Sequence, residues 1–279
     1  MAMKLSTELT ERTHQEDLQR IRGFRLMDED FLAVCLDCNS DCTELVLRIV
    51  LGMPDLRVTA VYTGGTTASL LDRSVVLDIL ATDSKGRRFG VKIQREYQSS
   101  GRKYARFNLG MMDADQMKTE ADFHALTENY VIIITEHDPM GYGLPLYHVE
   151  RTVLQTGERF DDGAHILYVN GEYRGDDPLG KLMHDFSCTN PNDMNFGVLA
   201  DRVRFFKESK EGVAVMCKVI EDMRLQERKE GREEGCAEVI RLLQAIAAGQ
   251  TDEEIQMDNT YADFDLIKKI RTALSGATD

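Results

Sequence analysis

The sequence predicts an α/β protein, because segments with a helical repeat of apolar residues alternate with short β-branched runs. Between residues 25 and 150 the predicted order is helix, three strands, helix, strand. From about residue 212 the chain is highly charged, with acids and bases three or four positions apart, which predicts a long solvated helix or a helical pair. We therefore expect a helical extension (1–24), an α/β domain (25–211) and a charged helical tail (212–279).

Two helices are predicted ahead of the first strand. A charged helix covers roughly residues 14–23. In the second helix Asp41 is the expected N-cap, the end is expected near Gly52, and Pro54 prevents continuation. The core-facing side of this helix carries apolar residues at helical spacing: Leu45, Val46, Ile49 and Val50.

Three strands follow. The segment "DLRVTAVYT" is a short strand and "GGTTASLLDR" a loop, after which "SVVLDILAT" and "RRFGVKIQRE" form two strands joined by a tight turn. A three-residue loop ending in a left-handed Gly86 closes this hairpin and pairs Asp83 with Arg87. Each further step keeps the sum of the paired positions at 170, so Asp78 falls opposite Lys92.

The remaining elements alternate in type. A helix is expected from residue 101 to about 124, followed by the strands "YVIIITEHD", "LPLYHVER" and "HILYVNGEYRG". Two helices, "DPLGKLMHDF" and "FGVLADRVRFFKES", precede the charged tail, and a small helical unit, "DFDLIKKIRTALSG", closes the chain. The glycines of "GYG" (141–143) and the pair Gly64 and Gly65 lack the context of a nucleotide-binding loop and are expected to form turns.

Composition bounds the class of protein. The 279 residues are 42% hydrophobic, which is enough for a core, and no run approaches the length of a membrane span. The charged N-terminus lacks a signal-peptide core, so we expect a cytoplasmic protein, and the six cysteines suit a reducing compartment. Cys35, Cys38 and Cys42 would share one helix face, and core packing is favoured there over a metal cluster.

The third strand has an unusual polar face. Alternation places Phe89, Val91 and Ile93 on one side, and Gly90, Lys92 and Gln94 on the other. Asp78 lies in the apolar run "VVLDILA", where an unpaired carboxylate would be costly. Asp78 is therefore expected to meet a cation, a metal ion or a hydrogen-bond donor, and the hairpin register makes Lys92 that partner.

At these residues the chain resembles a known family. The stretch "LDILATDSKGRRFGVKIQ", with "RKYARFNLGMMDADQM", "YVIIITEHD" and "LPLYHVER" in the same order, is similar to the PD-(D/E)XK nuclease family transposases, also called Rpn-type recombination-promoting nucleases. The similarity covers about residues 24–208. It implies a restriction-endonuclease-like αβββαβ core with a mixed sheet, and a Mg²⁺-dependent DNA endonuclease linked to recombination and transposition.

The resemblance also implies roles for single residues. In the family, an acid of the second strand and an acid of the third strand hold the metal ion, and a glutamine follows two residues later. Asp78 matches the first acid and metal ligand, and Gln94 matches the glutamine, but Lys92 stands where relatives have glutamate. An ammonium at this position repels Mg²⁺ strongly, so we expect metal binding and cleavage to be absent or strongly impaired.

Three interpretations remain open. The chain could be an intact nuclease with a rearranged site that uses Glu44 and Asp78. It could be a pseudo-nuclease, natural or engineered, in which Lys92 pairs with Asp78, and this interpretation is favoured. The family role could still be DNA cleavage although this copy cannot perform it. Glu96 lies too far along the strand to replace the missing acid, and Gln98 and Tyr104 are near the site without a specific signal.

A basic segment suggests a DNA-binding surface in a chain whose net charge is −14. Seven of its residues are candidate phosphate contacts: Lys85, Arg87, Arg88, Arg95, Arg102, Lys103 and Arg106. The other interpretation of this segment is a solvated hairpin tip and helix face. DNA is thus the expected partner, with homo-oligomerisation through the C-terminal helices as a further possibility. The rival functional class is a non-enzymatic module that binds DNA or, through the tail, another protein.

Overall fold

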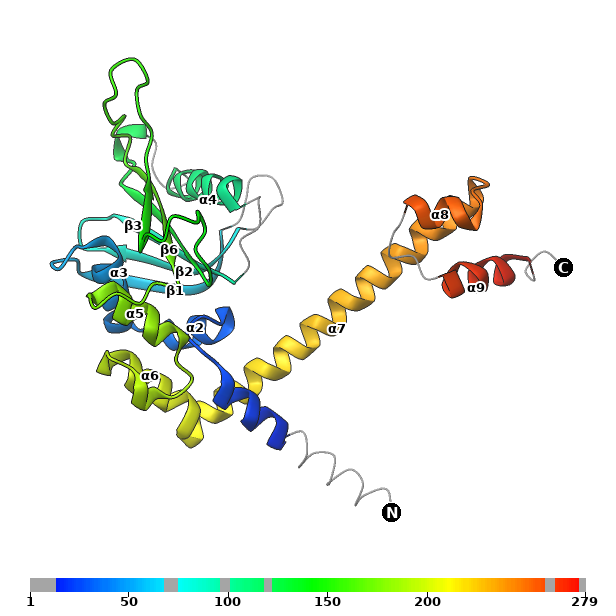
Figure 1. Ribbon diagram of the computed structural model, residues 1–279, viewed down its shortest axis with the longest axis horizontal. Coiled ribbons are helices and arrows are strands. Elements are labelled where there is room, and N and C mark those ends of the chain that lie inside the picture. Colours follow the sequence, from blue (N-terminus) through cyan, green and yellow to red (C-terminus); the bar gives the residue numbers. More distant parts are fainter. Residues whose placement is uncertain (1–13, 68–74, 96–100, 118–121, 259–263, 276–279) are drawn as a thin grey trace. The chain divides into compact units, whose positions relative to one another are not determined.

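The structure is a computed structural model that describes residues 14–67, 75–95, 101–117, 122–258 and 264–275 (Figure 1). The chain forms two compact units, Met1–Cys217 and Lys218–Asp279. The first unit contains a six-stranded sheet with helices on both sides, which confirms the predicted α/β class.

The sheet is mixed, as expected, with the strand order β1-β2-β3-β4-β6-β5. Its first three strands are antiparallel neighbours, β3, β4 and β6 are parallel, and β5 returns antiparallel to β6 at the edge. The strands are β1 (Val58–Thr67), β2 (Val75–Asp83), β3 (Arg88–Gln94), β4 (Asn129–Thr135), β5 (Leu146–Val149) and β6 (Ala164–Asn170). β1 continues through Gly64 and Gly65, so the predicted loop at these glycines is wrong: Gly65 pairs with Leu77 in the ladder.

The hairpin between β2 and β3 has the predicted register. The paired residues run from Ile79↔Val91 to Thr82↔Arg88, and each pair sums to 170. Gly86 has a φ of 79°, the left-handed conformation expected for a three-residue closure. The Asp83 carboxylate fixes the turn by accepting hydrogen bonds from the backbone N–H groups of Lys85 and Arg87, both at 2.9 Å.

The segment that contains Cys35, Cys38 and Cys42 forms two helices, although the spacing of these cysteines predicted a shared face on one helix. Helix α2 (Glu29–Leu36) and helix α3 (Ser40–Leu51) are separated by a turn in which Cys38 has a φ of 50°. Cys38 is exposed, whereas Cys35 and Cys42 are buried, so the expected shared face is wrong. Asn39, not Asp41, caps α3, because its side chain accepts from the Cys42 N–H at 2.9 Å. The left-handed Gly52 ends α3 as predicted.

Helix α4 (Gly101–Gln116) covers one side of the sheet, while α2, α3 and α5 (Pro178–Ser187) lie on the other side (Figure 1). It packs on a buried cluster that includes Leu77, Val131, Ile133 and Tyr168. The helix ends earlier than the predicted residue 124, and a short 3-10 turn (Phe123–Ala125) follows. In the parallel pairing Lys92 faces Ile133, which places Lys92 on the α4 side.

Turns and helices complete the two units. The predicted turn at "GYG" is confirmed by positive φ values of 75° at Gly141 and 69° at Gly143. Helix α6 (Gly197–Glu208) belongs to the first unit, and the predicted long charged helix is α7 (Lys210–Ala247). In the second unit α8 (Asp252–Asp258) and α9 (Phe264–Ser275) pack with the last turns of α7 around a small core of Leu242, Ile255 and Ile267. Within the described ranges, no helix is long and apolar enough to cross a membrane.

Candidate functional site

The centre of the candidate site is the predicted pair of Asp78 and Lys92. The Lys92 Nζ donates to Asp78 Oδ1 at 2.6 Å, so the expected ion pair is confirmed. The Asp78 side chain is fully buried, and its second oxygen, Oδ2, accepts the Ile93 backbone N–H at 2.6 Å. Both oxygens of this carboxylate are therefore occupied by donors from β3, which offsets the cost of burying its charge.

Glu29, at the start of α2, is a third member that the sequence analysis missed. Its Oε1 lies 2.5 Å from Lys92 Nζ, so a single ammonium joins two carboxylates from different elements. Glu29 is half-exposed, in contrast to Asp78. The only sequence signal was the acidic run at residues 28–30 in front of an apolar segment, which is typical of any helix N-terminus.

The electrostatics of the pair follow from burial and from this sharing. Burial raises the pKa of Asp78 to about 7, and the nearby Glu29 adds to the rise, whereas Lys92 and the Ile93 N–H oppose it. Burial by itself would lower the pKa of Lys92, but Asp78 and Glu29 together raise it above its usual value. Lys92 is thus the charged partner, and Asp78 is the group that takes up a proton most readily.

Gln94 lies two residues beyond Lys92, on the same face of β3. Its side-chain Oε1 is buried and has no hydrogen-bond partner among the described residues. A buried amide oxygen without a partner is costly, and such groups often mark a functional position. Tyr104 on α4 is near enough to feel the charges of this group. Burial raises the pKa of Tyr104, the charges of Asp78 and Glu29 raise it further, and the charge of Lys92 lowers it.

The structure does not bring Glu44 to this pair. One Glu44 oxygen contacts Arg48 and Arg57, and the other accepts the Val58 backbone N–H at 2.9 Å. Glu44 therefore joins α3 to the start of β1, and the second carboxylate that contacts Lys92 is that of Glu29. Glu96 and Gln98 lie outside the described residues.

The residues do not fit the magnesium ion that the family resemblance implies. A Mg²⁺ site needs oxygen ligands around the ion, and the ammonium of Lys92 lies at hydrogen-bond distance from both carboxylates that could supply them. The Lys92 charge would repel a divalent cation at that position. The pair of Asp78 and Lys92 therefore offers no place for a magnesium ion.

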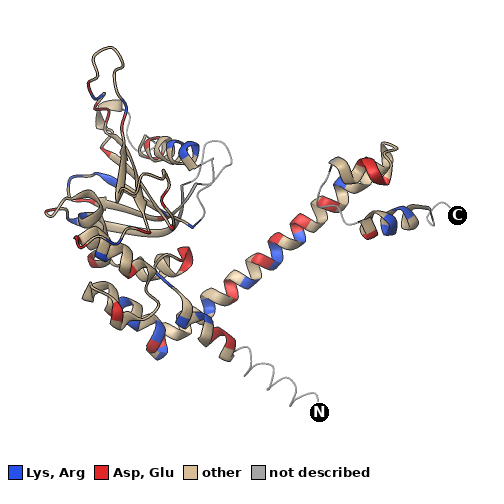
Figure 2. Ribbon diagram, in the orientation of Figure 1, with Lys and Arg blue, Asp and Glu red and all other residues tan. Residues whose placement is uncertain are grey.

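The predicted basic surface divides into two groups. Arg87 and Arg88 are mostly buried in ion pairs with Asp83 at 2.7 Å and with Asp115 at 2.8 Å. Arg95 pairs with Glu136 at 3.1 Å. Lys85 is exposed at the hairpin turn, and three exposed cations lie along the first half of α4, seen in blue in Figure 2: Arg102, Lys103 and Arg106. Arg95 is itself 59% exposed, so Arg95, Lys85 and the three α4 cations are all accessible to a ligand in solution.

A second group of side chains lies at the β5 edge of the sheet. His148, Glu150 and His165 each offer one ligand atom, and these atoms lie within 4.8 Å of one another. The Glu150 Oε1 is 3.2 Å from His148 Nε2 and 3.7 Å from His165 Nδ1, and Oε2 is held by Arg159 Nε at 2.9 Å. The sequence gives no local signal for this group, because the group forms only when β5 pairs with β6.

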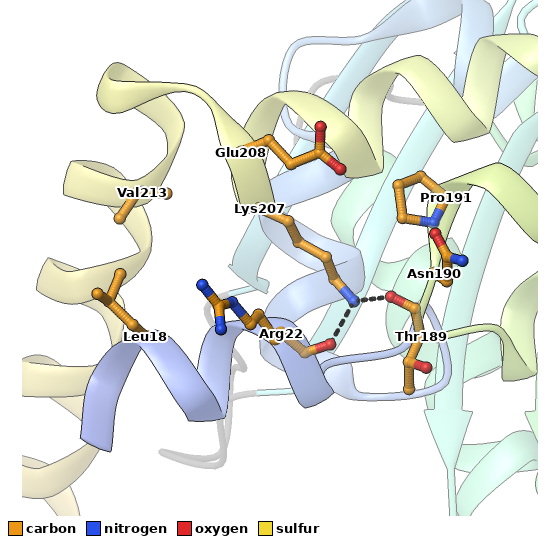
Figure 3. A pocket seen from close by; sticks show the side chains of 8 residues that line it. All are labelled: Leu18, Arg22, Thr189, Asn190, Pro191, Lys207, Glu208 and Val213. Atoms are coloured by element: carbon orange, nitrogen blue, oxygen red, sulfur yellow. Dashed lines mark hydrogen bonds between the residues drawn. The ribbon is translucent and has the colours of Figure 1, made fainter. Parts of the chain in front are cut away.

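A cavity of about 530 Å³ lies near Lys207, and Figure 3 shows the side chains that line it. The Lys207 ammonium donates to three backbone carbonyls, those of Arg22, Phe24 and Thr189, at 3.0, 2.5 and 2.5 Å. Burial lowers the pKa of Lys207 to about 8. Because all three of its N–H donors are used, Lys207 ties the end of the first helix to the loop after α5 and has no donor left for a ligand.

No protein-family model matches this chain, and neither the curated proteins nor the solved structures that were compared with it give a match.

Proposed function

We propose that this protein is a pseudo-nuclease, in which a nuclease scaffold has replaced its metal ion by the ammonium of Lys92. The observation that carries the proposal is the position of Lys92 Nζ, 2.6 Å from Asp78 and 2.5 Å from Glu29. A divalent ion held by two carboxylates would need the same space between the same oxygens. The lysine thus brings one positive charge to the two carboxylates but supplies no Lewis acid.

The arrangement of the sheet supports this proposal. A helix precedes three antiparallel strands, and a crossover through α4 leads to β4, parallel to β3. This is the αβββαβ order that the resemblance to PD-(D/E)XK nucleases implies. In this proposal Asp78 on β2 and Gln94 on β3 correspond to the acid and the glutamine that the resemblance implies. The buried oxygen of Gln94, which lacks a partner among the described residues, is consistent with a site that once bound a ligand.

DNA is the proposed ligand of the intact scaffold. The exposed cations of α4 (Arg102, Lys103 and Arg106) lie on the helix that also carries Tyr104, the residue whose pKa responds to the Asp78 and Lys92 charges. Cations beside the former cleavage site would hold a phosphate backbone in a protein that binds DNA without cutting it. A link to recombination is part of this proposal.

The test is to restore the missing acid. In the variant Lys92→Glu, three carboxylates (Asp78, Glu29 and the new side chain) would surround the position of the ammonium, and Mg²⁺ could bind. We expect the wild-type protein to leave supercoiled plasmid intact in the presence of Mg²⁺, and the variant to nick or linearise it. The readout is gel electrophoresis of the plasmid over time.

Two controls make the result specific. Lys92→Met removes the cation without adding a ligand and should remain inactive, and Lys92→Glu combined with Asp78→Asn should lose the restored cleavage. Brisk cleavage by the wild-type chain would refute the proposal. A folded Lys92→Glu variant that binds DNA but never cuts it would favour the rival interpretation, a binding module without a nuclease site.

A further inference from the structure

A site at the opposite edge of the sheet has the geometry of a metal centre. His148 lies on β5 and His165 on β6, and Glu150 directly follows β5. The pairing His148↔Leu167 and Val149↔Ile166 continues to place Glu150 opposite His165. His148 and Glu150 are two residues apart in an extended segment, so all three side chains project from the same face of the sheet.

The distances between the ligand atoms match those around a tetrahedral ion. Zn²⁺ binds imidazole nitrogen and carboxylate oxygen at about 2.0 to 2.2 Å, which separates neighbouring ligands by roughly 3.4 Å. The Glu150 Oε1 lies 3.2 Å from His148 Nε2 and 3.7 Å from His165 Nδ1. A tetrahedral ion could therefore sit among the three atoms with small side-chain adjustments.

The His165 ring nitrogen is the second observation that points to a ligand. Nδ1 is buried and has no hydrogen-bond partner within the part of the chain that the structure describes. The ring is held by stacking on Tyr130, with a centroid distance of 4.3 Å and an interplanar angle of 16°. Tyr130 in turn stacks on Phe89, at 5.1 Å, so a row of rings across three strands fixes the direction of Nδ1.

Arg159 is the partner of Glu150 on the side away from the two histidines. Its Nε holds Glu150 Oε2 at 2.9 Å, while Oε1 faces the two imidazoles. Its Nη1 makes only a longer contact of 3.4 Å with Oε1. A partner that grips the second oxygen of a ligating carboxylate orients it for the metal, as outer-shell groups do in metalloproteins. Arg159 is largely exposed and free to adjust when an ion binds.

We propose that His148, Glu150 and His165 bind a divalent transition-metal ion of the zinc type, which cross-links β5 to β6. Two imidazoles and one carboxylate suit Zn²⁺ or Co²⁺ better than Mg²⁺, which prefers oxygen ligands alone. Three protein ligands leave one tetrahedral position for water. This site is independent of Asp78 and Lys92, because it is built from strands at the other edge of the sheet.

Two measurements on the whole chain test the proposal. In the first, the chain is titrated with Co²⁺ and the visible absorption of the cobalt complex is recorded. In the second, the chain competes with a coloured chelator for Zn²⁺. We expect one ion per chain, bound through nitrogen and oxygen ligands. The variants His148→Ala, Glu150→Gln and His165→Phe should each weaken binding by at least about a hundredfold, the upper end of what loss of an outer-shell partner costs. Phenylalanine at position 165 keeps the stacked ring and so protects the fold.

The matched control is His137→Ala. His137 forms a histidine–glutamate pair with Glu172 at 2.8 Å but belongs to no such three-residue group among the residues that the structure describes, so its removal should leave binding unchanged. Zn²⁺ should also raise the melting temperature of the wild type and of His137→Ala, but not of the three site variants. A variant that melts at the wild-type temperature without zinc has kept its fold.

Three results would overturn the proposal. One is a dissociation constant of the wild type for Zn²⁺ that is millimolar or weaker. The group would then be two histidines that contact a glutamate, without a metal ion. Another is equal binding by His137→Ala and the site variants. The third is an intense sulfur-to-cobalt charge-transfer band, which would assign the ion to some of the six free cysteines.

Discussion

Asp78 is a fully buried carboxylate that shares one ammonium with a second carboxylate, Glu29. The apolar neighbours of Asp78 in β2 required a partner for its charge, and the hairpin register supplied Lys92. The register alone could not show that a second carboxylate contacts the same ammonium, nor which of the two carboxylates takes up a proton more readily. With two carboxylates and one ammonium, the group that is most deeply buried is the one that gains a proton.

This balance predicts a pH dependence of stability. The pKa of Asp78 rises from 3.8 in the unfolded chain to about 7 in the folded protein. Between these values the folded state holds a proton that the unfolded chain has released, so the stabilisation from Asp78 is complete below the lower value and is lost as the pH rises through the upper one. Asp78→Asn removes this ionisation and should make the slope of unfolding free energy against pH more positive in this window.

Denaturant unfolding at several pH values measures the slope, and one group contributes at most about 1.4 kcal/mol per pH unit. Glu44→Gln is the matched control of opposite sign. The pKa of Glu44 is lowered, because the hydrogen bond from Val58 and the arginine partners outweigh burial. The stabilisation that Glu44 gives the folded state is present above the pKa of Glu44 in the unfolded chain, and it is lost as the pH falls through the lower pKa of the folded state. An identical slope in wild type and Asp78→Asn would show that the Asp78 pKa is not raised.

At the scale of elements, the packing of α4 on the sheet depends on a glycine in β3. A Cβ built on Gly90 would lie 2.8 Å from a methyl carbon of Leu77 and 3.1 Å from the sulfur of Met112. The sequence showed Gly90 on the polar face of the strand without a reason for glycine. The reason is the close approach of two side chains, Leu77 of β2 and Met112 of α4, which no local pattern in β3 reveals.

Two glycine substitutions separate close packing from backbone effects. Gly90→Ala should destabilise the protein by about 1 to 3 kcal/mol, because the added methyl group overfills the contact between α4 and the sheet. Gly110 lies within α4 with nothing within 4 Å of a built Cβ, so Gly110→Ala should stabilise by about 0.5 to 1 kcal/mol. Urea unfolding of both variants gives the comparison. If both substitutions changed the free energy of unfolding equally and in the same direction, close packing at Gly90 would not be the cause of the destabilisation.

For the whole molecule, electrostatics decides whether DNA can be bound at all. The net charge of −14 repels a polyanion, so binding would depend on a local group of exposed cations. The sequence grouped seven basic residues, but folding commits Arg87, Arg88 and Arg95 to acids within the chain. The exposed cations on α4, Arg102, Lys103 and Arg106, are the surface that the DNA proposal depends on.

Neutralising these α4 cations tests that surface. The triple variant Arg102→Gln, Lys103→Gln and Arg106→Gln should bind duplex DNA more weakly, and the slope of log affinity against log salt should decrease by about 2 to 3 because three phosphate contacts are lost. The matched control changes three exposed cations of α7, Arg228, Lys229 and Arg232, to glutamine. Fluorescence anisotropy at several salt concentrations measures both. Equal losses in the two triple variants would mean that net charge, and not the α4 surface, controls binding.

The sequence by itself determined the hairpin from β2 to β3 and the contact of Asp78 with Lys92, because turn geometry at Gly86 propagates along a ladder of neighbouring residues. Only the tertiary structure decided which distant groups join these residues. The docking of α2 brings Glu29 to Lys92, and the pairing of β5 with β6 brings Glu150 to His165. Such contacts depend on how separate elements pack, and the local periodicity of the chain carries no record of that packing.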